Sequence, residues 1–221
     1  RSIDLAVHSL KDMPSQTPPE LRIGAVLARE DARDALISPS GATLAQLPAG
    51  AKVATGSPRR TVQLKAVRSD LEVAPTRGNV DTRVRKVKSG EADALLVASA
   101  GLHRLGMTEI ITEYLSTDSF LPAVGQAALA VEIRASDQEL EELLSAIEHP
   151  PTRQAVTAER AFLAGLGGGC QAPIAAHWQA LQRGVGEHRE LLESCPKFIS
   201  ELRGQFAVVD HLLGVSSDGL L

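Results

Sequence analysis

The chain has 221 residues, of which 43% are hydrophobic, and a net charge of −4 at neutral pH. These values suit a globular protein with buried cores and exclude nucleic-acid binding driven by overall charge. Aromatic residues make up only 3% of the chain, too few for a base-stacking surface, and no apolar run reaches the roughly 20 residues of a membrane-spanning helix.

The first expected element is a buried strand at 3–8, where the sequence opens on an apolar run without an initiating Met. We therefore expect residues to be missing upstream, and any targeting segment with them. A second strand is expected at 22–28. The charged stretch 28–35 breaks the apolar pattern and favours a crossing between domains.

Strands and helices then alternate along the chain. Strands are expected at 52–57, 71–76, 92–100, 126–134, 173–181 and 205–215, and helices at 57–70, 79–91, 136–149, 151–166 and 188–204. This alternation predicts βαβ units and a mainly parallel sheet, with ligand sites beyond the C-terminal ends of its strands. Proline and glycine in the stretch 120–126 favour a second crossing.

Arginines gather at two of the expected strand-to-helix turns. Arg59 and Arg60 follow the N-cap Ser57 in a first helical turn, where free N–H groups and the helix dipole already favour anions. Arg77 lies in the next turn and Arg83 in the helix after it. Both turns should share one sheet edge, which suits a ligand with several carboxylates because arginine binds carboxylates bidentately. A solvated basic face is the alternative. That interpretation is favoured for four other cations: Arg68, Arg85, Lys86 and Lys88.

A polar turn follows the first strand in the segment VHSLKDMP at 7–14. It contains Lys11 and Asp12. A carboxylate at a strand end can face a ligand and stabilise a cation that develops on it. An ordinary turn in which Asp12 caps a backbone N–H explains the same residues, and is favoured by the local sequence alone.

A cysteine follows three glycines in the segment GGGCQAP at 167–173. The glycines allow positive φ values and leave the Cys170 thiol uncovered, so the residue is either a nucleophile or a packed cysteine. Cys195, in an amphipathic helical pattern, is interpreted as structural. Two cysteines make no disulfide framework and favour a reducing compartment. A single disulfide is the alternative. With scattered histidines they predict no zinc site.

Six segments, in this order, resemble the porphobilinogen deaminase family. They are VHSLKDMP (7–14), GSPRR (56–60), TRGNVDTR (76–83), LLVASAGLHRLG (95–106), LPAVGQAAL (121–129) and TAERAFL with GGGCQAPI (157–174). The resemblance runs from residue 3 to residue 177. No single segment is specific, but the combination is.

The resemblance implies hydroxymethylbilane synthase activity, a transferase reaction of tetrapyrrole biosynthesis. Four porphobilinogen molecules condense head to tail with loss of ammonia, and the chain grows on a dipyrromethane cofactor. It further implies that a thioether links this cofactor to Cys170 and that Asp12 is catalytic. The other cofactor-binding positions that it implies are Lys11, Ser57, Arg59, Arg60, Arg77 and Arg83.

The implied architecture is α/β, with two lobes resembling type-II periplasmic binding proteins and a small α+β C-terminal domain. We expect domain 1 at 1–30 and 126–147, domain 2 at 31–125 and domain 3 at 148–221, atypical after residue 177. The family's first strand and helix are absent from this sequence, so the first lobe should expose apolar surface. Ala127 stands where the family usually has glycine.

We expect a monomer that acts on porphobilinogen in the cytoplasm, or in a plastid, without metal, nucleic acid or membrane. An inactive or partial family member is the main alternative. A carboxylate-solute binding module is another, although it has no use for a glycine-flanked cysteine. A cysteine hydrolase would need a paired histidine, and none of the six histidines shows such a pairing.

Overall fold

The structure is a computed structural model and describes residues 3–165 and 174–177. The chain divides into two compact units, with the divisions after Ala28 and after Ala127. In the described residues, unit 1 contains the chain up to Ala28, the segment from Ala128 to Gly165 and residues 176–177. Unit 2 contains residues 29–127 and 174–175. The divisions lie in the 28–35 stretch and just after the 120–126 stretch, where crossings are expected.

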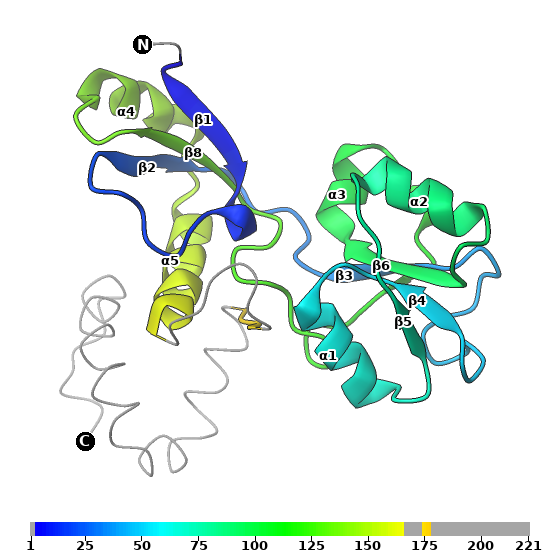
Figure 1. Cartoon of the computed structure of the whole chain (residues 1–221). Helices are drawn as coiled ribbons and strands as arrows, with labels where there is room; N and C mark the ends of the chain where they lie inside the picture. The colour runs from blue at the N-terminus through cyan, green and yellow to red at the C-terminus, as the bar shows by residue number, and fades with distance from the viewer. Residues whose placement is uncertain (1–2, 166–173, 178–221) are drawn as a thin grey trace, which may run out of the picture. The chain divides into compact units, whose positions relative to one another are not determined.

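Unit 1 is built on a three-stranded sheet in the order β1–β8–β2 (Figure 1). Its strands are β1 (Leu5–Ser9), β2 (Leu21–Val26) and β8 (Leu129–Arg134), and its helices are α4 (Gln138–Leu144), α5 (Pro150–Gly165) and the short 3₁₀ helices η1 (Leu10–Asp12) and η3 (Ser145–Ile147). Both strand pairs are antiparallel. Successive residues of β8 alternate between the faces, so Val131 packs with Leu144 of α4 and Ala130 with Val156 of α5.

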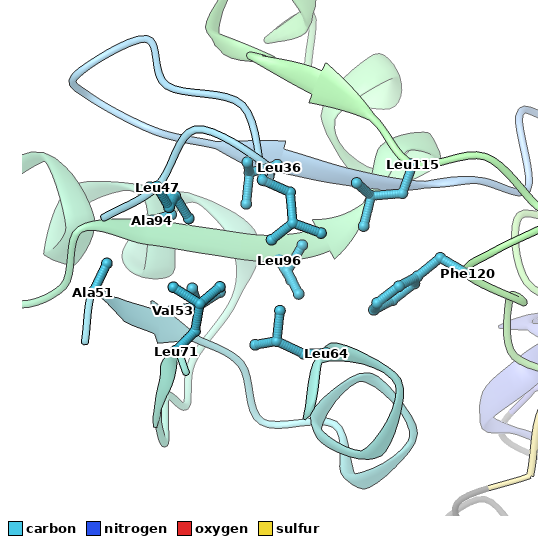
Figure 2. Close-up of a cluster of buried hydrophobic side chains, with 11 residues drawn as sticks. Leu36, Leu47, Ala51, Val53, Leu64, Leu71, Ala94, Leu96, Leu115 and Phe120 are labelled. Atoms are coloured by element: carbon cyan, nitrogen blue, oxygen red, sulfur yellow. The ribbon is translucent and has the colours of Figure 1, made fainter. Parts of the chain in front are cut away.

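Unit 2 contains a five-stranded sheet in the order β5–β4–β6–β3–β7. The strands are β3 (Asp34–Ile37), β4 (Lys52–Ala54), β5 (Glu72–Ala74), β6 (Ala94–Ala98) and β7 (Glu113–Tyr114), and the helices are α1 (Pro58–Val67), α2 (Val80–Lys88), α3 (Ser99–Arg104) and the 3₁₀ helix η2 (Thr108–Ile110). Helix α1 covers one face, with Leu64, Leu96 and Phe120 gathered there (Figure 2). Helices α2 and α3 cover the other face (Figure 1).

The expectation of a mainly parallel sheet is only partly right. Strands β5, β4 and β6 are parallel, as βαβ units require. Strand β3, however, is antiparallel to β6 and β7, and the described sheet of unit 1 is antiparallel. The antiparallel strands β3 and β8 border the unit divisions, where the chain passes between sheets instead of returning through a helix.

The C-terminal expectations lie largely outside the described residues. This holds for the predicted helix at 188–204 and strand at 205–215, and for most of domain 3. Of the predicted strand at 173–181, the described residues 174–177 have no regular secondary structure. Among the described residues, no helix is long and apolar enough to cross a membrane.

Candidate functional site

The two arginine-bearing turns lie side by side at one edge of the unit-2 sheet. Because β4 and β5 are parallel, the turns that lead from them into α1 and α2 leave at the same edge, as expected. A Cβ atom on Gly56 would lie 2.6 Å from the carbonyl oxygen of Thr76. The two turns are therefore in backbone contact, which only a residue without a side chain allows.

Both helices begin at a side-chain N-cap, and Ser57, the cap of α1, is the one expected from the sequence. The Ser57 hydroxyl accepts a hydrogen bond from the Arg60 backbone N–H at 3.4 Å, with Pro58 in the first turn. The Asn79 side chain accepts one from the Thr82 N–H at 3.0 Å. Each cap occupies one free N–H and leaves others of the first turn facing the shared edge.

Arg59 and Arg60 are buried and share one carboxylate. Their exposed fractions are 4% and 5%, and that of Asp34 on β3 is 0%. Asp34 Oδ2 accepts from Arg59 Nη2 at 2.7 Å, and Oδ1 accepts from Arg60 Nε at 3.0 Å and Nη2 at 2.7 Å. Two guanidinium groups against one carboxylate leave this cluster with a net positive charge.

Gln126 completes the buried cluster. Its Nε2 donates to Asp34 Oδ1 at 2.9 Å and to the Ala32 carbonyl at 2.7 Å, while its Oε1 lies 3.5 Å from Arg60 Nη2. The residue has no exposed surface. Every polar group of its side chain is thus paired, as burial of an amide requires.

The electrostatics of the cluster favour a bound anion. Burial alone would raise the pKa of Asp34, but the charges and hydrogen bonds of Arg60 and Arg59 lower it overall, so the carboxylate is ionised. Burial lowers the pKa of Arg59 against the attraction of Asp34. Arg59 Nε is buried and has no hydrogen-bond partner among the described residues. An acceptor from a ligand would satisfy this donor.

Arg83 and Arg77 extend the cationic edge toward solvent. Arg83 is half-buried and its Nε donates to the Gly78 carbonyl at 2.7 Å. Burial lowers its pKa, and the neighbouring charge of Arg60 acts in the same direction. Arg77 is exposed. The structure thus brings together the five predicted site residues of unit 2, which are Ser57, Arg59, Arg60, Arg77 and Arg83.

Lys11 and Asp12 lie in η1 of unit 1, directly after β1. The turn is fixed by a hydrogen bond from the Leu10 N–H to the Ala128 carbonyl at 3.0 Å and by the burial of Leu10 and Met13. Asp12 is exposed, and among the described residues its carboxylate accepts no hydrogen bond. The capping role that an ordinary turn would give Asp12 is therefore not found. The predicted cofactor anchor Cys170 lies outside the described residues.

Two residues of the site, Asp34 and Gln126, were not predicted from the sequence. Asp34 lies at the end of the charged stretch 28–35, whose acidic and basic residues gave no sign of which is buried. Gln126 lies in a turn-like segment. The resemblance to family segments marked the neighbourhood of Gln126 but assigned it no role.

The residues at this edge fit an anionic cofactor better than a metal ion. Guanidinium groups cannot ligate a cation, whereas they bind carboxylates well. No cluster of three or more His, Cys, Asp or Glu that could hold a metal occurs in the described part of the chain. The donor set and the unsatisfied Arg59 Nε are compatible with the carboxylate-bearing rings of a dipyrromethane.

Comparison with known proteins decides the family. Residues 1–142 match the family model described as porphobilinogen deaminase, dipyrromethane cofactor binding domain. The chain belongs to the porphobilinogen deaminase family. Residues 153–185 match the model of the C-terminal domain of the same family. This chain therefore contains the family's cofactor-binding region, as the resemblance implied.

The curated relatives include porphobilinogen deaminases of two bacteria. That of Roseiflexus castenholzii is 53% identical over 174 residues, which are 79% of this chain and 57% of the relative. That of Mycolicibacterium gilvum is 47% identical over 218 residues, 99% of this chain and 68% of the relative. The chain thus spans little more than half of the length of the first of these relatives.

Solved structures with similarity to the chain include binding proteins. A putative methionine-binding lipoprotein of Bacillus subtilis matches with a TM-score of 0.41 and 12% identity, covering 60% of this chain and 63% of that one. A nutrient binding protein from Burkholderia cenocepacia bound to methionine matches with a TM-score of 0.41 and 15% identity, covering 61% and 65%.

Proposed function

We propose that this chain acts as a hydroxymethylbilane synthase, which condenses four porphobilinogen molecules head to tail, with loss of ammonia, on a covalently held dipyrromethane. The observation that carries the proposal is the guanidinium cluster at one sheet edge, with the buried Arg59 Nε unsatisfied within the described residues, in a chain of this family. Porphobilinogen bears two carboxylates on each ring. A growing chain of such rings needs several cationic partners, which this edge supplies.

Cys170 is proposed as the attachment point of the dipyrromethane through a thioether. When bound, this group supplies the pyrrole end from which the product grows. Arg59, Arg60, Arg77 and Arg83 would hold its carboxylates. Lys11 and Ser57 complete the proposed cofactor-binding set. The support is the positive charge of the arginine cluster and the match of the cysteine segment to the family.

Asp12 is proposed as the catalytic carboxylate. In each step the carbon–nitrogen bond of the aminomethyl group breaks, ammonia leaves and positive charge develops on the substrate. A new carbon–carbon bond then forms to the next ring, and the ring hydrogen that it replaces leaves as a proton. An exposed carboxylate on a fixed turn can stabilise the cation and the pyrrole N–H groups and accept that proton.

Intact-protein mass spectrometry tests the anchor directly. The full chain should carry a dipyrromethane adduct that gives a positive reaction with a pyrrole-specific colour reagent, and peptide mapping should place the adduct on Cys170. Cys170→Ser should lose it, whereas the matched variant Cys195→Ser should keep it. A folded wild-type protein with an unmodified Cys170 would contradict the assignment and leave an inactive or partial family member.

Steady-state kinetics test Asp12. Asp12→Asn keeps the size of the side chain and removes the charge, so turnover of porphobilinogen should fall by about a hundredfold or more while the protein stays folded. The control is Asp81→Asn, which changes an exposed aspartate in the first turn of α2. Normal turnover in Asp12→Asn would contradict the catalytic role. Binding of porphobilinogen without adduct or turnover would favour a carboxylate-binding module.

The remaining parts of the proposal concern assembly and location. We propose that the protein works as a monomer on a small-molecule substrate, in the cytoplasm. Sedimentation of the full chain tests the first point, and fractionation of cells that produce the protein tests the second.

A further inference from the structure

One carboxylate orients both buried arginines. Asp34 binds Arg60 through Nε and Nη2, two donors on the same edge of the guanidinium group, at 3.0 and 2.7 Å. This contact fixes the plane of the guanidinium, whereas a single donor would leave it free to rotate. The other oxygen of Asp34 binds Arg59 Nη2 at 2.7 Å. Arg59 also donates through Nη1 to the Leu121 carbonyl, and Arg60 through Nη1 to the Leu96 carbonyl at 3.5 Å. Asp34 is the ionised partner that both arginines share.

Gln126 in turn holds Asp34. Its amide nitrogen bridges Asp34 Oδ1 and the Ala32 carbonyl, at 2.9 and 2.7 Å. Its own backbone is fixed as well, because its carbonyl accepts from Arg29 Nε at 2.9 Å and its N–H donates to the Ala123 carbonyl at 2.9 Å. The Asp34 carboxylate therefore accepts hydrogen bonds from two arginines and from an amide whose own backbone is held in place.

We propose that Asp34 and Gln126 are positioning residues, which hold Arg59 and Arg60 in the orientation that presents their remaining donors to a carboxylate of the ligand. The inference rests on the proposed function, because it takes a carboxylate-bearing pyrrole as the ligand. Without the buried carboxylate, each guanidinium would lose its charged partner and keep neutral acceptors, such as the Leu121 carbonyl for Arg59 and the Leu96 carbonyl for Arg60. Its plane would then be free to turn, since a buried charge needs a partner. In the present orientation Arg59 Nε has no hydrogen-bond partner among the described residues and can donate to a ligand carboxylate.

A competing role predicts the opposite result for affinity. If Asp34 merely occupied the donors that the ligand needs, its removal would free them and tighten binding. If Asp34 positions the arginines, its removal weakens binding even though the net positive charge of the cluster increases. Affinity and arginine accessibility, measured on the same variants, separate the two roles.

The experiment uses the full chain and two pairs of matched variants. Asp34→Asn removes the shared charge. Its control Asp31→Asn removes a carboxylate that, among the described residues, accepts from Arg33 at 2.6 to 3.0 Å. Gln126→Met removes the bridging amide. Its control Gln46→Met removes another side-chain amide of unit 2, whose Oε1 accepts from the Thr43 N–H at 3.0 Å.

Two measurements are made on each variant. The rates at which 2,3-butanedione modifies Arg59 and Arg60 are followed by peptide mass spectrometry, with the exposed Arg77 as the internal standard. Calorimetric titration gives the affinity for porphobilinogen. In Asp34→Asn we expect modification of Arg59 and Arg60 about tenfold faster and binding about tenfold weaker, because charge-assisted hydrogen bonds are lost. Gln126→Met should change both in the same direction by less, and the controls should match the wild type.

Each outcome decides one question. Unchanged modification rates in both variants, or tighter binding in Asp34→Asn, would overturn the positioning role. If Asp34→Asn does not fold, Gln126→Met decides, because it keeps the charge balance and nearly the volume. A wild-type chain that binds no porphobilinogen and carries no adduct would instead refute the proposed function, and the modification rates would still show whether Asp34 and Gln126 hold the arginines.

Discussion

The carbonyl oxygen of Thr76 lies 2.6 Å from the position that a Cβ atom on Gly56 would occupy. This contact joins the turns that carry Arg59 and Arg77. In Gly56→Ala the methyl group would collide with backbone, which cannot rotate away as a side chain can. We expect a loss of about 1–3 kcal/mol in the free energy of unfolding, measured by urea denaturation, and weaker binding of porphobilinogen because the two turns move apart.

Gly101→Ala is the matched control for this substitution. Gly101 lies within α3, and the nearest atom to its added Cβ is Cγ2 of Val80 at 3.3 Å, a side-chain atom that can shift. Alanine is favoured over glycine in a helix by up to about 1 kcal/mol. The control should therefore be neutral or slightly stabilising, and equal losses in both variants would show that the Gly56 contact has no special role.

Ala127 has a φ of +73° and is the one residue other than glycine with a positive φ in the described part of the chain. This conformation costs alanine roughly 1–2 kcal/mol. Ala127→Gly removes that cost but loses a methyl group packed against Ala32 and Ala100, a loss of about 0.8 kcal/mol. The free energy of unfolding should therefore stay unchanged or rise by up to about 1 kcal/mol.

The neighbouring Ala128→Gly gives the comparison for Ala127. Ala128 is fully buried and has an ordinary φ, so replacement by glycine should lower the free energy of unfolding by about 1 kcal/mol or more. Denaturation curves of the two variants should move in opposite directions or differ clearly in midpoint. Equal destabilisation in both would argue against strain at Ala127.

The sequence predicted the βαβ part of the fold better than the antiparallel part. Helices α1 and α2 are marked by Ser57, Pro58 and Asn79, residues whose local chemistry favours a helix start. Strand β3 was missed because its first residue is Asp34, and a carboxylate in a strand core is explained only by partners on other elements. Local patterns carry no record of such long-range pairing.

In the candidate site, too, local patterns were predicted and long-range contacts were not. Family segments indicated which arginines matter, and parallel strands explain why their turns meet. The sequence could not tell that Arg59 and Arg60 are buried or that Asp34 and Gln126 hold them. Arg68 also makes contacts that the sequence did not indicate. It was interpreted as part of a solvated face, yet it donates to the Leu44 and Leu47 carbonyls at 2.6 and 2.8 Å.

Glu148 links β2 to the start of α5 and should make unit 1 sensitive to acid. It accepts from the Val26 N–H at 2.8 Å and from Arg153 at 2.6 and 2.8 Å. Burial would raise its pKa, but the hydrogen bonds from Arg153 and Val26 lower it overall. Because the folded pKa lies below the unfolded one, the stabilisation is complete above the unfolded pKa and is lost as the pH falls through the folded pKa.

The variant Glu148→Gln tests this linkage. At pH 7 its free energy of unfolding should be about 1–3 kcal/mol below that of the wild type, and the difference should shrink below about pH 4. Glu139→Gln, at an exposed position of α4, should follow the wild type at every pH. Thermal unfolding between pH 3 and pH 8 supplies the data, and a constant difference across that range would exclude the assigned titration.

Apolar side chains are exposed on β1 of the unit-1 sheet and just before it. Ile3, Leu5 and Val7 are 65%, 38% and 59% exposed, and β1 pairs on one side only in the described sheet. An open strand edge with an apolar face favours pairing between molecules.

Val7→Lys should therefore slow aggregation without destabilising the fold. A charge on an edge strand opposes pairing with another strand, and the free energy of unfolding should change by no more than about 0.5 kcal/mol because the site is exposed. Val62→Lys is the control, since Val62 is 57% exposed but lies on α1 in unit 2. Light scattering of concentrated samples should fall for Val7→Lys and not for Val62→Lys. An equal fall in both would assign the effect to net charge instead of to the strand edge.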